Sequence, residues 1–311
     1  MINVVVMGEC MVEFSLISPG VYRQSFAGDV YNTAVYLKRL QQEQANVSIL
    51  SGIGNDSLSQ QMCAAFAKEN INCEYLQSVE QRIPGAYLIQ TSDSGERSFV
   101  YWRDSSAAKF VLSSLTKQSQ KQLVASTDMF YFSGISLAII TPEDRELLWQ
   151  LLSQLRKADV QIVFDSNYRP RLWQSASEAM AMYQQAFEYS DVVFAGVEDF
   201  ELLYELASYD SIRDYLKPFE ISELIIKNGS EDVMCISESG QDVIAVTPVD
   251  IVVDSTSAGD SFNAGYLHAR AQQKNIRQAV ELACSVSGLV IAHQGAIVDT
   301  DIFSQFIAKI T

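Results

Sequence analysis

The sequence predicts an α/β fold built around a mostly parallel sheet. Short apolar runs occur at residues 3–7, 129–132 and 162–164, without the polar alternation of a half-exposed strand. Such runs are typical of strands that are buried on both faces of a parallel sheet. A helical pattern at residues 142–157 separates the last two runs and begins with a proline. This alternation of strand and helix predicts parallel strands joined by helical crossovers. Further strands are predicted at residues 47–50, 192–194, 224–227 and 233–236.

Length and composition favour one large domain. The chain has 311 residues, of which 48% are hydrophobic, enough for a single α/β domain over residues 1–311. A net charge of −16 argues against nucleic acid as a partner, because that interaction depends on clustered cations. No apolar run approaches the roughly 20 residues of a membrane span, and the amino terminus lacks the pattern of a signal peptide. We therefore expect a cytoplasmic protein with no nucleic acid or membrane partner.

Cysteines, histidines and glycines exclude several other classes of site. The five cysteines are widely separated and lack metal-ligand spacing, so they predict neither a disulfide framework nor a metal centre. With only His268 and His293 available, a histidine-rich zinc site is not expected. The glycine pattern at residues 52–57 lacks the third glycine of a dinucleotide-binding loop, where Ser57 stands. A nicotinamide-dependent enzyme is therefore disfavoured.

A hairpin is predicted where two β-rich runs flank a polar turn at residues 92–96. Alternation along its second strand puts aromatic side chains on both faces, with Phe99, Tyr101 and Arg103 on one and Val100 and Trp102 on the other. A hairpin of this kind needs cover on both faces. It is either a lid that closes on a substrate or an ordinary pair of strands in the main sheet. In the first case residues 11–26 and 84–104 approximately form the lid, and the protein is a homo-oligomer that associates through it.

The stretch at residues 254–267 carries the most specific pattern. A β-branched run at residues 249–253 predicts a strand before it and helical spacing follows, so the turn lies at a helix N-terminus. Its backbone N–H groups at Ala258, Gly259 and Asp260 are then available to bind phosphate oxygens. An acidic side chain at a phosphate site is explained if Asp260 takes a proton from an attacking hydroxyl. The alternative role for Asp260 is that of a helix N-cap.

This stretch resembles the C-terminal signature of the ribokinase-like (PfkB) carbohydrate kinases, Asp-Thr-x-Gly-Ala-Gly-Asp. Ser255 and Ser257 replace the threonine and the central glycine, and the matching positions are Asp254, Thr256, Ala258, Gly259 and Asp260. The resemblance covers nearly the whole chain. It implies a ribokinase-like three-layer fold with a small β-sheet lid, and it implies ATP as phosphoryl donor with Mg²⁺. It also implies that Asp260 is the catalytic base and that the backbone of residues 258–260 holds the developing phosphate charge.

Three segments resemble the 2-keto-3-deoxygluconate kinases within this family: GECMVEF, the hairpin from GAYLIQ to YWRD, and NYRPRLW. The resemblance implies transfer of the ATP γ-phosphoryl group to the C6 hydroxyl of that sugar acid. The substrate contacts that it implies are Gly28, Asp29, Asn32, Tyr87, Tyr101, Arg103 and Arg169. Arginine suits a carboxylate because it stays charged and binds bidentately. Glu13 is either a further sugar contact or a solvated strand residue.

Nucleotide and metal sites also follow from the resemblance. The ATP contacts that it implies are Asn167, Lys227, Gly229, Ser230 and Ser287. Asp199 is the candidate for organising Mg²⁺, and a site for a monovalent cation such as K⁺ would be bordered by Asp254, Thr256 and Gly295. Two alternatives stay open: a fructokinase or ribokinase acting on a neutral sugar, and a non-catalytic sugar-acid sensor.

Overall fold

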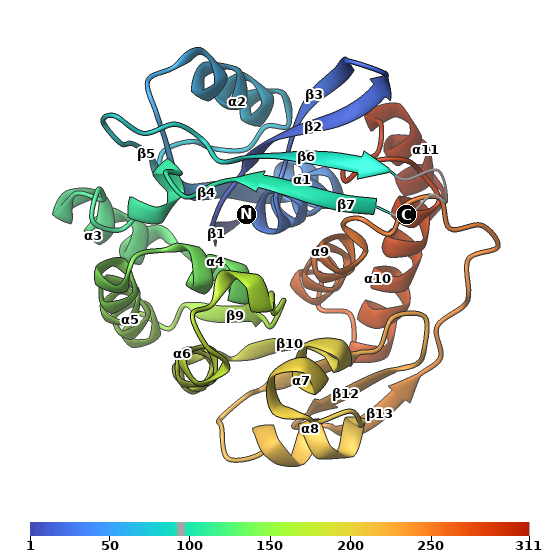
Figure 1. Ribbon diagram of the computed structural model, residues 1–311. Helices are drawn as coiled ribbons and strands as arrows, with labels where there is room; N and C mark the ends of the chain where they lie inside the picture. Colours follow the sequence, from blue (N-terminus) through green and yellow to red (C-terminus); the bar gives the residue numbers. More distant parts are fainter. Residues whose placement is uncertain (92–96, 311) are drawn as a thin grey trace.

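A computed structural model describes residues 1–91 and 97–310 and confirms the α/β fold with its mostly parallel sheet (Figure 1). The main sheet has nine strands in the order β13-β12-β11-β10-β9-β8-β1-β4-β5. Strands from β11 to β5 in this order pair in parallel, and β12 and β13 are added at one edge as antiparallel neighbours. The strands are β1 Ile2–Met7, β4 Ala45–Ile53, β5 Leu76–Ser78, β8 Met129–Ser133, β9 Gln161–Asp165, β10 Val192–Gly196, β11 Glu223–Lys227, β12 Val233–Ser237 and β13 Gly240–Ile244.

Helices cover both faces of the main sheet because apolar side chains of the buried strands point alternately to each face. In β1, Val4 and Val6 pack in the core under α1, α2, α9, α10 and α11, whereas Val5 and Met7 pack under α3 to α8 (Figure 1). Among the residues that the structure describes, no helix is long and apolar enough to cross a membrane. The helices are α1 Asp29–Gln41, α2 Ser57–Lys68, α3 Lys117–Ser126, α4 Gly134–Ile139, α5 Pro142–Lys157, α6 Ala176–Tyr189, α7 Val197–Tyr204, α8 Tyr209–Leu216, α9 Ala258–Ala271, α10 Ile276–Ile291 and α11 Thr300–Ile310, with short 3-10 turns at Gln42–Gln44, Ala107–Phe110 and Pro170–Leu172.

The predicted hairpin belongs to a separate four-stranded sheet in the order β3-β2-β6-β7, so the alternative that placed it in the main sheet is wrong. The strands of this lid are β2 Met11–Ser18, β3 Val21–Ala27, β6 Ala86–Thr91 and β7 Arg97–Trp102. On its outer face Val100 and Trp102 are 38% and 57% exposed. The predicted turn at residues 92–96 lies outside the described residues.

The predicted strand at residues 249–253 is wrong, because these residues form a loop. Residues 251–253 are more than half exposed, at 70%, 58% and 52%. The backbone N–H groups of Val253 and Asp254 both donate to the carbonyl oxygen of Ile291 at the end of α10. β-branched side chains form a strand only where a neighbouring strand edge and cover are present, and here the segment binds a helix end instead.

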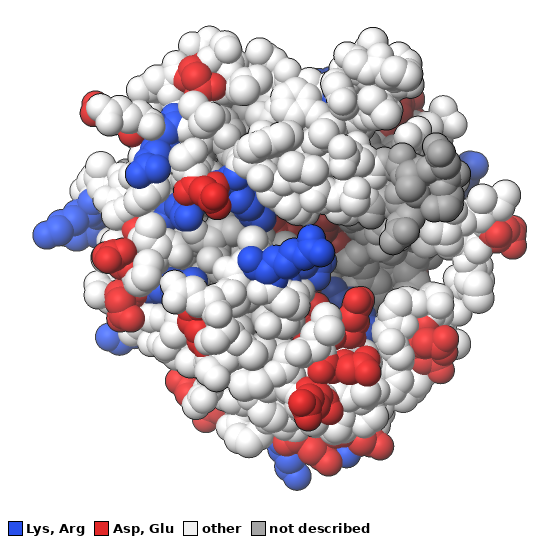
Figure 2. All heavy atoms as spheres, viewed as in Figure 1, with Lys and Arg blue, Asp and Glu red and all other residues white. Residues whose placement is uncertain are grey.

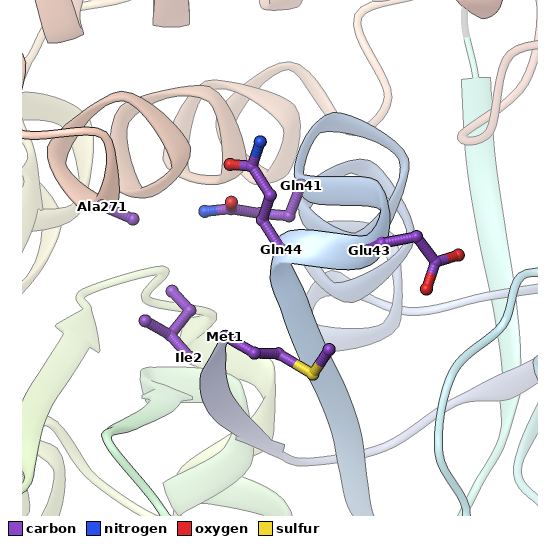
Figure 3. Close-up of a pocket in the computed structure, with 6 residues that line it drawn as sticks. All are labelled: Met1, Ile2, Gln41, Glu43, Gln44 and Ala271. Atoms are coloured by element: carbon purple, nitrogen blue, oxygen red, sulfur yellow. The ribbon is translucent and has the colours of Figure 1, made fainter.

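Two surface hollows lie at the amino ends of the parallel strands. The larger has a volume of about 530 Å³ and lies where β1 begins and where α1 and α9 end (Figure 3). Its lining residues are Met1, Ile2, Gln41, Glu43, Gln44 and Ala271. The smaller, of about 210 Å³, is beside it and includes residues at the starts of β8, β9 and β11. Ligands of parallel α/β sheets bind at the carboxyl ends of the strands, so neither hollow is in the expected position.

Candidate active site

Polar side chains from several loops meet at the carboxyl edge of the main sheet. Ser133 and Asp165 end the neighbouring strands β8 and β9 and pair with each other in register. Glu9 lies just after β1, and Gly196 ends β10. Because this edge is where parallel α/β sheets bind ligands, segments that are far apart in the sequence contribute to one site.

Two helices begin at this edge. Gly28 is the N-cap of α1, and α9 begins at Ala258. Asn32 Nδ2 donates to Asp260 Oδ2 at 2.8 Å, and Thr33 Oγ1 donates to the Asp260 carbonyl oxygen at 3.3 Å. The first backbone N–H groups of each helix and the positive end of its dipole favour an anion here.

Asp260 is buried in this contact and is not a helix cap. It is the third residue of α9, whose N-cap is Ser257, so the N-cap alternative is wrong. Burial, followed by the charge of Asp29, raises the pKa of Asp260 to about 7, and the hydrogen bond from Asn32 opposes this rise. A carboxylate with a pKa near neutrality is matched to accept a proton at physiological pH.

Ser257 occupies a backbone conformation that favours glycine. Its φ of 66° and ψ of 13° are left-handed, a region that L-residues other than glycine, asparagine and aspartate rarely adopt. This left-handed conformation explains why the family signature has glycine at this position. Serine is strained here.

Asp29 connects the first turn of α1 to the end of β8 and to the loop after β9. Its Oδ2 accepts hydrogen bonds from Ser133 Oγ at 2.5 Å and from Asn167 Nδ2 at 3.3 Å. Burial raises the pKa of Asp29, and the hydrogen bond from Ser133 opposes this rise. Asn167, which the family resemblance assigns to ATP, therefore contacts a predicted sugar-binding residue.

Lys227 directs its ammonium group towards the start of α9. Its Nζ lies 2.8 Å from Asn263 Oδ1 and 3.3 Å from Asp165 Oδ1. A β-carbon placed on Gly259 would lie 3.7 Å from the same Nζ. A cation therefore stands next to backbone N–H groups that are suited to phosphate, in a site otherwise rich in carboxylates.

Of the remaining predicted nucleotide residues, Ser287 contacts the same helix start, and Gly229 and Ser230 follow Lys227 in the next turn. Ser287 Oγ donates to the Ala258 carbonyl oxygen at 2.9 Å, which ties α10 to the first turn of α9. Gly229 has a φ of 57°, so it takes the left-handed position of the turn between β11 and β12. Ser230 is exposed in that turn. Gly229 and Ser230 are both exposed to solvent two and three residues after Lys227.

Aromatic and acidic side chains line the inner face of the lid. Tyr87 is buried, and its hydroxyl donates to Glu13 Oε2, while Ser25 Oγ donates to Glu13 Oε1 at 2.8 Å. Glu13 is only 6% exposed, so its interpretation as a solvated strand residue is wrong. The rings of Tyr87 and Tyr101 lie 5.8 Å apart, and Tyr101 stacks with Phe99 at 6.2 Å. The lid therefore offers a flat surface with hydroxyl groups to the site.

The two predicted carboxylate-binding arginines differ in environment. Arg103, after β7, pairs with Glu9, and the two side chains are 11% and 1% exposed. Arg169 is 56% exposed, and its Nη1 lies 3.7 Å from Asp199 Oδ1. In the view of Figure 2, Lys and Arg side chains lie close together near the middle of the molecule, although the chain as a whole is strongly acidic.

The predicted metal residues are bound mainly to other protein groups. Asp199 Oδ2 accepts from Ser166 Oγ at 2.5 Å, and burial raises the pKa of Asp199 to about 6. In the described part of the chain, no group of three His, Cys, Asp or Glu side chains is arranged to hold a metal ion. Mg²⁺ in such sites is usually held by one or two carboxylates together with the substrate phosphates, so the role of Asp199 in organising the ion stays a prediction.

The three residues predicted to border a monovalent-cation site lie together, because Asp254 accepts hydrogen bonds from the other two. Its Oδ1 accepts from the Thr256 N–H at 3.0 Å and its Oδ2 accepts from the Gly295 N–H at 2.6 Å. Gly295 has a φ of 92°, which glycine adopts readily. The carboxylate thus joins the loop before α9 to the loop after α10.

Sequence reasoning missed four polar residues of the site. They are Glu9, Ser133, Asp165 and Asn263. The first three lie at or just after the ends of predicted parallel strands, and that position was the available signal. Asn263 lies one helical turn after Gly259, within the same helix start. Neither signal alone separates a site residue from an ordinary turn or helix residue.

The chain belongs to the pfkB family of carbohydrate kinases, whose family profile matches residues 1–302. It is 37% identical to 2-dehydro-3-deoxygluconokinase of Escherichia coli K12, over 95% of this chain and 97% of that protein. It is 35% identical to the enzyme of the same name from Dickeya dadantii, over 95% of this chain and 96% of the relative. This name is a synonym of 2-keto-3-deoxygluconate kinase.

Two solved kinase structures have the same fold. The 2-dehydro-3-deoxygluconokinase of Thermotoga maritima aligns with a TM-score of 0.84 at 19% identity, over 99% of this chain and 98% of that chain. A fructokinase of Xylella fastidiosa with bound ATP aligns with a TM-score of 0.83 at 20% identity, also over 99% and 98%. The ribokinase-like fold with its lid, which the sequence resemblance implied, is therefore confirmed.

Proposed function

We propose that this kinase transfers the γ-phosphoryl group of ATP to the C6 hydroxyl of 2-keto-3-deoxygluconate. The observation that carries the proposal is a largely buried arginine side chain, that of Arg103, placed beside the aromatic inner face of the lid, where it suits the carboxylate of a sugar acid. Curated relatives with this activity in their names are 35–37% identical over nearly the whole chain, which supports the same assignment.

Asp260 is the general base of the proposed reaction. It takes the proton of the C6 hydroxyl as that oxygen forms a bond to the γ-phosphorus, and the bond between the γ-phosphorus and the departing ADP oxygen breaks. The backbone N–H groups of residues 258–260 and the ammonium group of Lys227 stabilise negative charge on the transferred group. A preorganised site of this kind needs little rearrangement during the reaction.

The lid side of the site binds the sugar acid. Arg103 and Arg169 bind the carboxylate end, while Tyr87 and Tyr101 contact the carbon chain. A neutral sugar has no carboxylate to bind these arginines. The arginines would then gain no charged partner from the ligand, and this disfavours binding of a neutral sugar. This argument favours a sugar acid over the fructokinase and ribokinase alternatives.

Mg²⁺ enters the proposal with the nucleotide, because Asp199 is already engaged by Ser166 and Arg169. A bound ion would neutralise phosphate charge. A monovalent cation such as K⁺ would lie near the loops that Asp254 joins, and its effect would be on the conformation of the turn that starts α9.

Location and assembly complete the proposal. The kinase acts in the cytoplasm and forms a homo-oligomer through the outer face of the lid. Leu16, Tyr22, Val100 and Trp102 share this face and are each 38–57% exposed. Contiguous exposed apolar groups favour an interface. Analytical ultracentrifugation tests the assembly, and a sample that sediments with the mass of one chain at micromolar concentration would contradict it.

An ADP-release assay with a panel of sugars tests the reaction. The panel contains 2-keto-3-deoxygluconate, its C4 epimer, gluconate, fructose and ribose, each with ATP and Mg²⁺. We expect the highest kcat/KM with a 2-keto-3-deoxy sugar acid and a product phosphorylated at C6, identified by NMR. A higher kcat/KM with fructose or ribose would overturn the substrate, and no turnover with any sugar would favour a sensor.

A further inference from the structure

An ion pair joins the core of the kinase to its lid. Glu9 follows strand β1 of the main sheet, and Arg103 follows strand β7 of the lid. Arg103 Nη2 donates to Glu9 Oε2, and Glu9 is 2% exposed. These residues are 94 positions apart in the chain, so the pair is made by the tertiary fold and has no local origin.

Gly85 provides the space in which the pair forms. A β-carbon placed on Gly85 would lie 2.5 Å from Glu9 Oε1 and 3.2 Å from the β-carbon of Arg103. The first distance is shorter than any ordinary contact of a β-carbon, so the carboxylate would have to move. The φ of Gly85 is not in the left-handed region, so the absence of a side chain is the property that matters here.

The paired guanidinium lies next to residues of the substrate site. Its central carbon is 5.8 Å from the ring centre of Tyr101. Its charge also reaches Asp29: burial raises the pKa of Asp29, and the positive charge of Arg103 is among the effects that lower it. Arg103 therefore lies beside a core carboxylate and a lid tyrosine, and its charge acts on the first residue of α1.

The Glu9–Arg103 ion pair is not arranged to add much to the stability of the fold. Within the described structure, Glu9 Oε1 and Arg103 Nε are buried and have no hydrogen-bond partner. A buried ion pair repays the cost of desolvation only when its remaining polar atoms are also satisfied. Replacing such a pair by apolar residues is often neutral or stabilising, so its presence here calls for a role beyond holding the fold.

We propose that Glu9 is a positioning residue for sugar-acid recognition: it fixes the guanidinium of Arg103 so that other N–H donors of that group meet the substrate carboxylate. The arginine side chain has many rotamers, and a group that is ordered before binding loses less entropy when the ligand arrives. Gly85 is the second part of this device, since it permits Glu9 and Arg103 to approach. This inference rests on the proposed role of Arg103.

Steady-state kinetics of Glu9→Gln and Gly85→Ala test the proposal. Glutamine keeps the size of the side chain and one acceptor but removes the charge, and alanine at position 85 displaces the carboxylate. We expect KM for the sugar acid to rise about tenfold in each variant, the usual range for one charge-assisted hydrogen bond. We expect kcat within about twofold of wild type and an unchanged KM for ATP.

Glu223→Gln is the matched control. Glu223 pairs with Arg270 through side chains that are 14% and 32% exposed, at the start of β11 and beyond the opposite end of the sheet from the lid. Its loss should lower the melting temperature and leave both KM values unchanged. This control separates the loss of an ion pair in general from the loss of the pair at the site.

Two results would overturn the inference while the proposed function stands. One is an unchanged KM for the sugar acid in Glu9→Gln; the other is a lower KM, which would mean that Glu9 competes with the substrate for Arg103. Failure of the wild-type enzyme to phosphorylate any sugar acid would instead overturn the proposed function together with this inference. The wild-type assay is therefore run first.

Discussion

The two halves of the active site are assembled in different ways. The transfer half, around the start of α9, takes its backbone donors and its base from three consecutive residues, 258–260. The recognition half, under the lid, depends on pairs that are distant in the chain: Tyr87 and Glu13 are 74 residues apart, and Arg103 and Glu9 are 94 apart. The difference indicates that the base and the backbone donors of phosphoryl transfer are encoded locally, whereas substrate identity is encoded by tertiary contacts.

This difference predicts how mutations act on each half. Loss of a group in the transfer half that contacts the reacting atoms, such as the carboxylate of Asp260, should lower kcat. A change in the recognition half alters how the sugar acid is held, so its KM should rise while turnover is partly retained. The comparison would fail if a variant in the recognition half lowered mainly kcat, or if loss of a reacting group in the transfer half raised mainly the KM for the sugar acid.

The largest effect is expected for Asp260→Asn in the transfer half. Asparagine preserves the shape and can still accept the hydrogen bond from Asn32, but it cannot take up the hydroxyl proton. We expect kcat to fall by about 100-fold or more, the usual range for loss of a general base. Single-turnover kinetics with 2-keto-3-deoxygluconate measure this, and KM for the sugar acid should stay within about threefold. Turnover near that of wild type would contradict the role of Asp260.

Lowering the pH should reduce activity through the transfer half by nearly as large a factor. Because Asp260 works as a base, only its deprotonated form is active, and burial raises its pKa to about 7. Activity should therefore be full above that pKa and fall tenfold per pH unit below it, which gives about a 100-fold loss at pH 5. Initial rates of kcat/KM between pH 5 and 9 measure this fall. A profile that stays flat down to pH 5 would contradict it, and recovery of activity on return to pH 8 excludes irreversible inactivation.

The transfer half was the more predictable part of the site from sequence. Ala258, Gly259 and Asp260 form one pattern, and helix physics alone indicated an anion site there. What remained undecided was whether Asp260 caps the helix, because capping depends on the conformation of Ser257, which no local pattern gives. The strand expected at 249–253 failed for a related reason: its β-branched residues lack a neighbouring strand edge, and only the tertiary fold determines that.

The next effect is expected in the recognition half, for arginine-to-lysine exchanges. Lysine keeps the positive charge but cannot bind a carboxylate bidentately. Arg103 is 11% exposed in its side chain and Arg169 is 56% exposed, and solvent weakens charge interactions. We expect kcat/KM for the sugar acid to fall about 30-fold in Arg103→Lys and about fivefold in Arg169→Lys. Residual turnover of fructose is the internal control, since a neutral sugar should be unaffected. Equal losses on both substrates would show a general defect.

The recognition half could be predicted only in part. Alternation along β7 correctly placed Phe99 and Tyr101 on one face, because the side-chain period of a strand is a local property. Glu9 gave no such signal, since its role depends on a partner in another sheet. Glu13 was left undecided for the same reason, and its burial becomes evident only when the hydroxyl of Tyr87 is seen to donate to it.

The smallest effect is expected at the strained turn of the transfer half, with Ser257→Gly. Glycine adopts the left-handed conformation without a steric penalty, so the variant should gain about 1 kcal/mol in free energy of unfolding. Urea denaturation measures the gain, and kcat should stay within about twofold. Glu205→Gly is the matched control, because Glu205 also has a left-handed φ, of 59°, at the end of α7. If both variants gain stability but Ser257→Gly alone loses turnover, the strained conformation of Ser257 contributes to catalysis, which would contradict the expected kcat. Loss of stability in Ser257→Gly would show that the serine side chain contributes more than its conformation costs.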